Sequence, residues 1–178
     1  MEKGTRIREP GTESVEPWLR GTHCEVDAVA RQVVHALELA EEDVEKWCDG
    51  LSDQEINARP FSLAPIAFHL RHIARSLDRL LTYAEGAQLD ATQKAALRSE
   101  MDEGATHAAV MAELRAALLA AMARVRMFSP ELYNAQRGVG RAMLPTSVAG
   151  LLVHCADHTQ RHVGQIVTTA KVLRALRS

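Results

Sequence analysis

Four segments of the chain carry apolar residues at three- and four-residue spacing, and this pattern limits the fold to a packing of helices. The segments span approximately residues 23–48, 64–86, 90–127 and 146–178. Aromatic residues make up only 4% of the sequence, whereas alanine and leucine, which favour helices, are abundant. The sequence therefore predicts an all-α fold, a four-helix bundle with a long connection before the last helix.

Helix-breaking residues separate these segments. Residues 1–22 mix glycines and prolines with charged residues, so we expect an N-terminal arm there and a single bundle domain over residues 23–178. Ser52 and Glu55 form a capping-box pattern that predicts a short helical turn. Asp90 can cap the third segment, which Gly104 interrupts. The prolines and glycines of residues 128–145 predict an irregular connection before the last helix.

The charge balance argues against nucleic acid as a partner. The chain has 21 basic and 23 acidic residues, for a net charge of −2, and a nucleic-acid-binding protein would carry a basic patch. Arg71, Arg75 and Arg79 form a short basic stripe, which we expect to be a solvated helix face. No segment reaches 18 consecutive apolar residues, so we expect no membrane association and a location in the cytoplasm.

His158 and His162 offer the clearest chemical signal. Two histidines four residues apart on a helix lie one turn above each other, so their rings can converge on one point. The pair borders an apolar stripe that includes Leu151, Leu152 and Ile166, which places it at the edge of a core. Neutral imidazole is a good ligand for transition metals. The pair therefore predicts a metal site, provided that another helix supplies a third ligand.

The second long segment offers two candidates for that ligand, His69 and His72. Helical periodicity places His69 nearer the centre of the apolar face formed by Ile66, Leu70 and Ile73. On periodicity alone, His69 is the better candidate.

Two stretches of sequence resemble the DinB-like superfamily of four-helix metalloproteins. One is Phe68-x-Leu70-x-His72-Ile73 after Pro65, and the other is His158-x-x-x-His162 followed by Gly164-Gln165. The superfamily includes thiol-dependent S-transferases and the N-terminal domains of mycothiol-dependent maleylpyruvate isomerases. The resemblance covers the chain from the first helix to the last, and it aligns His72, not His69, with the ligand position.

The resemblance implies a site of His72, His158 and His162 at one end of the bundle, which binds a divalent metal, Zn or Ni, and leaves coordination positions open. It also implies a metal-assisted thiol transfer or hydrolysis on a small-molecule substrate, with a low-molecular-weight thiol as a second cofactor. The alternative is a non-enzymatic dimer that binds a metal or ligand to sequester or sense it. One departure is Val163, which stands where relatives often carry arginine.

The resemblance further implies a homodimer, because superfamily members commonly pair through long helices. The third segment carries small residues around most of its circumference, which permits close helix approach: Ala105, Ala108, Ala109, Ala112, Ala116, Ala117, Ala120 and Ala121.

Rival chemistries find less support. Di-iron bundles need Glu-x-x-His pairs, and the sequence has none. Cys155 lies one turn before His158, but it falls inside the apolar stripe, where a cysteine is usually a small hydrophobic residue. We expect His154 to face solvent. No carboxylate takes a convincing position beside the histidines, and Asp78 and Asp157 point away from their apolar faces.

Overall fold

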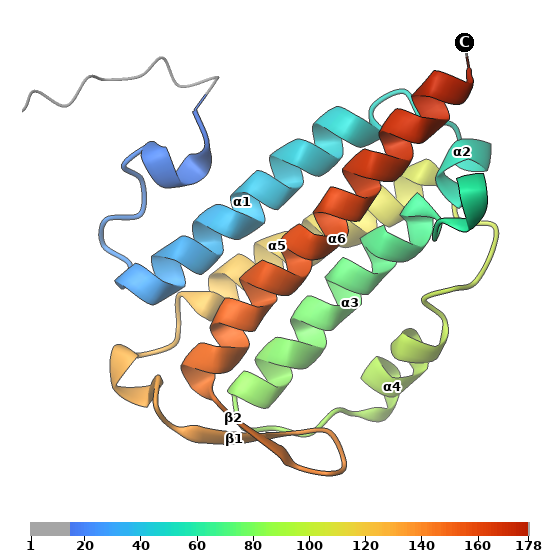
Figure 1. The fold of residues 1–178 in the computed structure, drawn as a ribbon. Coiled ribbons are helices and arrows are strands. Elements are labelled where there is room, and N and C mark those ends of the chain that lie inside the picture. The colour runs from blue at the N-terminus through green and yellow to red at the C-terminus, as the bar shows by residue number, and fades with distance from the viewer. Residues whose placement is uncertain (1–14, 178) are drawn as a thin grey trace, which may run out of the picture.

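The computed structural model describes residues 15–177, and the part of the predicted arm before residue 15 lies outside them. Four long helices form the bundle, as predicted: α1 (Ala28–Cys48), α3 (Ile66–Ala84), α5 (His107–Val125) and α6 (Val148–Leu176) (Figure 1). The connections contain the smaller elements α2 (Asp53–Asn57), α4 (Ala91–Arg98), the 3-10 turns η1 (Pro17–Leu19), η2 (Pro60–Ser62) and η3 (Pro130–Leu132), and the strands β1 (Gln136–Val139) and β2 (Leu144–Ser147).

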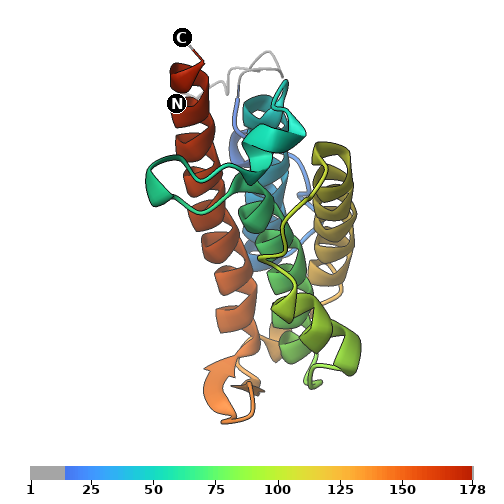
Figure 2. The same ribbon diagram turned by 90° about the vertical axis from the view of Figure 1, so that its right-hand side faces the viewer.

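The helices run in two parallel pairs. α1 and α6 point in one direction and α3 and α5 in the other, and α6 packs between α1 and α3 (Figure 1). Because α3 and α5 are parallel, the chain between them must return along the length of the bundle. The segment that contains α4 makes this return beside α3 (Figure 2). That placement brings residues 99–105 alongside the middle of α3.

A single apolar core fills the bundle. Each long helix turns one face inward, as its periodic apolar residues require. The largest fully buried side chains include Leu37 of α1, Leu70 of α3, Leu118 of α5 and Leu152 of α6. Val163, at the departure from the superfamily pattern, is also buried in this core.

The first long helix begins later than its sequence pattern suggests. It starts at Ala28, and Asp27 is its N-cap, accepting a hydrogen bond from the amide of Val29. Residues 23–26 instead form a turn in which the Val26 amide donates to the His23 carbonyl. The apolar Val26 fits the helical pattern, but the capping aspartate decides where the helix begins.

The third predicted helix is two separate helices. Asp90 caps α4 through a full capping box with Gln93, and Thr106 caps α5 by accepting a bond from the Ala109 amide. Gly104 lies between them with a φ of 77°, a left-handed conformation that glycine adopts without strain. The predicted interruption is thus a full break.

The connection before α6 is more regular than predicted. β1 and β2 pair as an antiparallel hairpin, with Gln136 opposite Ser147. Met143 packs closely on Gly138 in the hairpin: a Cβ at position 138 would lie 2.5 Å from Cε of Met143, so that side chain would have to move. Strands of four residues with mixed polarity give no periodic signal, so the sequence pattern did not reveal them. Among residues 15–177, no helix is both long and apolar enough to cross a membrane.

Candidate metal centre

Three histidines from two neighbouring helices converge near the middle of the bundle, not at one end of it as we expected. His72 comes from α3, and His158 and His162 come from consecutive turns of α6. One potential ligand atom of each lies within 4.8 Å of the others. The ring centroid of His72 lies 4.9 Å from that of His158 and 4.5 Å from that of His162. The packing of α3 against α6 therefore brings the three rings around one point.

A buried carboxylate fixes the ring of His72. Its Nδ1 lies 2.7 Å from Oε2 of Glu100, whose other oxygen accepts a hydrogen bond of 2.6 Å from Arg79. With Nδ1 directed at the carboxylate, Nε2 of His72 is the nitrogen that faces α6. It lies 3.2 Å from Nε2 of His158 and 3.4 Å from Oγ of Ser76. A hydrogen bond from the non-coordinating nitrogen to a carboxylate is the usual support of a metal-binding histidine.

Glu100 is ionised despite its burial. Only 5% of the residue is exposed, and burial acts to raise the pKa of its carboxyl. The hydrogen bonds from His72 and Arg79 outweigh that effect and hold the pKa below its ordinary value. A carboxylate beside the histidines thus offsets part of the charge that a divalent cation would bring.

His69 lies beside the three-histidine group without belonging to it. Its Nδ1 lies 2.9 Å from Nδ1 of His162, a hydrogen bond that leaves Nε2 of His162 free. Helical periodicity correctly placed His69 deeper in the core than His72. It was wrong in favouring His69 as the third ligand. His72, at the edge of the core, is the one that meets the pair on α6.

The histidines carry their lone pairs at neutral pH. Burial, followed by the neighbouring histidines, lowers the pKa of His158 to about 4. Burial also lowers the pKa of His162 and that of His69 to about 4. Imidazole nitrogens are ligands suited to zinc, nickel, copper or iron, so His72, His158 and His162 fit a divalent transition metal.

The basic stripe of α3 is not the solvated face that we expected from its spacing. Arg75 donates to Glu113 and to the carbonyl of Ala96, and Arg71 donates to the carbonyl of Asp102. Together with the bond from Arg79 to Glu100, these contacts fasten the segment that follows α4 to α3. The expectation failed because the return of that segment along α3 is a tertiary feature without a local pattern.

Glu100 is the supporting residue that the sequence reasoning missed. It lies in a polar connection, 28 residues from His72 in the chain, and no local spacing relates the two. Among the rivals, Cys155 is fully buried, and burial raises the pKa of its thiol to about 12, so it is no nucleophile. His154, which we expected to face solvent, is only partly exposed and pairs with Asp157.

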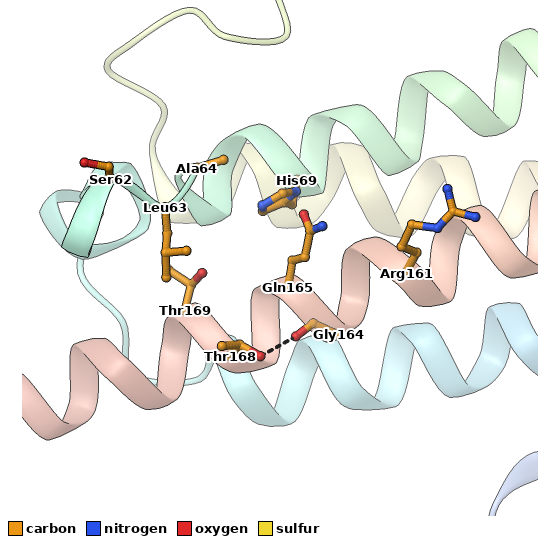
Figure 3. Close-up of a pocket in the computed structure, with 9 residues that line it drawn as sticks. All are labelled: Ser62, Leu63, Ala64, His69, Arg161, Gly164, Gln165, Thr168 and Thr169. Atoms are coloured by element: carbon orange, nitrogen blue, oxygen red, sulfur yellow. Dashed lines mark hydrogen bonds between the residues drawn. The ribbon is translucent and has the colours of Figure 1, made fainter.

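A cavity of about 510 Å³ adjoins the histidines through His69. Figure 3 shows His69 of α3 and Gln165 of α6 pointing toward each other at this cavity. Arg161 and Thr169 of α6 and Leu63, which precedes α3, also line it. The cavity thus combines one cation, an amide and hydroxyl groups with an apolar wall.

Comparison with known proteins agrees with this architecture. The chain matches the family model of the DinB superfamily over residues 36–166, more than half of its length. The chain belongs to the DinB superfamily. The crystal structure of a conserved protein from Enterococcus faecalis has the same fold as this DinB protein, with a TM-score of 0.69 and 17% identity over 83% of this chain and 98% of that chain. No curated protein matches the chain. Superfamily membership and the histidine cluster are compatible with metal binding.

We predict that His158→Ala removes stoichiometric metal from this centre without unfolding the helix, because alanine favours helices more than histidine does. His154→Ala, one turn earlier on α6 and outside the cluster, is the matched control and should change nothing. Zinc and nickel per chain are measured after equilibrium dialysis. If His158→Ala keeps the same metal content and affinity as His154→Ala, the three histidines are not ligands.

Chelation should lower the melting temperature of the wild type modestly and leave it folded, since the apolar core persists.

We also predict that Glu100→Gln weakens zinc binding by about 10- to 100-fold, because the carboxylate orients His72 and contributes negative charge. Glu113→Gln, which removes the partner of Arg75 on the same side of α3, is the control and should leave the affinity unchanged. Competition with a chromogenic chelator gives both dissociation constants. Equal affinities in the two variants would contradict the role assigned to Glu100.

Proposed function

We propose that this DinB protein is a metal-dependent enzyme that transfers a thiol to a small molecule or hydrolyses it. The observation that carries the proposal is the cluster of three convergent histidines, supported by Glu100, beside a cavity large enough for a small substrate. His72, His158 and His162 would hold Zn or Ni. When bound, the metal would supply Lewis acidity, which favours the deprotonated form of a water or thiol at neutral pH. Three protein ligands leave room for such a group.

The cavity favours a substrate or thiol with an anionic group. Arg161 is its cation, and its nearest partner, Asp157, is 3.6 Å away with both side chains more than half exposed. Such a weak pair leaves the guanidinium free to bind a carboxylate. Relatives often carry an arginine at the position of Val163, which is buried here. Arg161, two residues earlier and therefore on a different side of α6, is the cation at this cavity.

The transfer forms one sulfur–carbon bond and breaks one bond of the acceptor. The thiol loses its proton, its sulfur attacks an electrophilic carbon, and the leaving group departs with the bonding electrons and takes up a proton. In hydrolysis, water replaces the thiol. In either reaction, Arg161 and Gln165 would orient the substrate, and His69 would position His162 through their shared hydrogen bond.

One observation favours a second function, metal or ligand binding without turnover. Glu100 is the carboxylate that contacts the cluster, and hydrogen bonds to His72 and Arg79 engage both of its oxygens. A protein that only sequesters or senses a ligand needs no free base.

The experiment that separates the two functions is a turnover screen. Zinc- and nickel-loaded protein is incubated with low-molecular-weight thiols and electrophilic or ester acceptors, and thiol loss and acid release are followed. We expect turnover that disappears in His158→Ala.

Arg161→Gln should raise KM for anionic substrates roughly tenfold, through loss of a charged hydrogen bond at an exposed position. Lys171→Gln, on the same helix beside Trp47, is the control. Saturable ligand binding without any turnover would favour the binding function.

We further propose that the protein acts as a homodimer in the cytoplasm. The cysteines Cys24, Cys48 and Cys155 are all unpaired, which suits a reducing compartment. The outer face of α5 exposes small residues and Leu119, a surface against which a second helix can pack closely.

The predicted dimer is tested by light scattering at micromolar concentration. We expect about twice the chain mass of 19.6 kDa, and Ala116→Glu on the exposed face of α5 should shift the protein toward monomer. A mass of one chain for the wild type would exclude the dimer.

A further inference from the structure

A second group of potential metal ligands lies at the start of α1. His23 precedes the helix, and His35 and Glu38 lie on it, three residues apart. One ligand atom of each residue lies within 4.8 Å of the others. The group shares no residue and no helix with the centre formed by His72, His158 and His162, so it is a separate site.

The local backbone brings the three side chains together. Residues three apart on a helix share a face, so His35 and Glu38 project to the same side of α1. The turn before the helix folds His23 back over this face, with a left-handed φ of 57°. Its Nε2 lies 2.6 Å from Oε1 of Glu38, and its ring centroid lies 5.5 Å from that of His35.

His35 is buried with an unsatisfied nitrogen. Only 4% of the residue is exposed; Nε2 lies 3.2 Å from Oγ1 of Thr22, and Nδ1 has no hydrogen-bond partner. An unpartnered polar atom in a core costs free energy, so such atoms are rare in native proteins. Burial also lowers the pKa of His35, and the neutral ring keeps a lone pair for a metal.

The contacts of His23 are compatible with both the metal-free and the metal-bound form of the site. Nδ1 of His23 lies 3.4 Å from a guanidinium nitrogen of Arg126 and 4.0 Å from Oε1 of Glu25. When Arg126 donates to Nδ1, the proton is on Nε2 and bonds to Glu38. When the lone pair of Nε2 binds a metal, the proton is on Nδ1, and the carboxylate of Glu25 is close enough to interact with this N–H group.

We propose that His23, His35 and Glu38 bind a second divalent transition metal ion, which fastens residues 15–27 to α1. Two imidazole nitrogens and one carboxylate oxygen are a donor set that binds zinc and ferrous iron in proteins. The chain from His23 to His35 would be closed into a loop by the ion, so the site stabilises the docking of the segment before the helix. This assignment does not depend on what the first centre does.

The test counts zinc in a protein whose first centre has been removed. His158→Ala combined with His162→Ala is stripped with chelator, dialysed against zinc and analysed for metal per chain. We expect two equivalents in the wild type, one in the double variant, and none when Glu38→Gln or His23→Gln is added. Circular dichroism confirms that each variant is folded. Both added changes are at partly exposed side chains, so neither creates a cavity in the core, as a substitution of the buried His35 would.

Glu42→Gln provides the matched control. Glu42 lies one turn beyond Glu38 on α1 and pairs with Arg20 outside the ligand group, so the double variant with this change should keep its one equivalent. A folded double variant that binds no zinc would overturn the second site. So would zinc that persists in both Glu38→Gln and His23→Gln, because it would be bound elsewhere. One equivalent in both the wild type and the double variant would support the second site while contradicting the first.

Discussion

The packing of α3 against α6 is the constraint on which the candidate centre depends. Two parallel rows of apolar residues, with Leu70 and Ile73 on one helix and Leu152 and Ile166 on the other, hold the helices in a fixed register. The histidines lie at the border of these rows, where a ring can leave the core and still be held by it. The rings of His158 and His162 lie 4.6 Å apart, so a shift of one turn, about 5.4 Å, would move His72 away from at least one of them.

The return of the chain from α3 to α5 places a supporting carboxylate beside the three histidines. Parallel helices cannot be joined by a short turn, so residues 85–106 must run back along the bundle. Arginines of α3 fasten this segment through Glu100 and the carbonyls of Ala96 and Asp102. Glu100 reaches His72 as a result of this route. The long connection that the parallel helices α3 and α5 require thus also supplies the carboxylate that orients a candidate ligand.

The two histidine groups illustrate two ways in which a helix protein can build a metal site. The first uses facing helices of the bundle core, and its geometry is as rigid as the packing between them. The second uses one helix face and a turn that precedes it, so an ion there would hold a segment in place. The three-histidine group lies beside a cavity, whereas the group on α1 lies against the segment that precedes that helix.

The sequence by itself determined the helices and the pair on α6, because helical spacing is a local property: His158 and His162 must lie one turn apart wherever the helix goes. Local capping signals such as Ser52 with Glu55 were also readable and are present in the structure. The choice between His69 and His72 was not decided by periodicity, since both lie near the apolar face, and the resemblance to a family was needed to favour His72. Only the tertiary structure brought Glu100 to His72 and His23 to Glu38, and only it paired the hairpin strands. The contacts of Glu100 and His23 join residues 28 and 15 positions apart, and they depend on how the connecting segments pack against the helices, which no local spacing encodes. The hairpin is local, but its four-residue strands are too short to give a periodic signal.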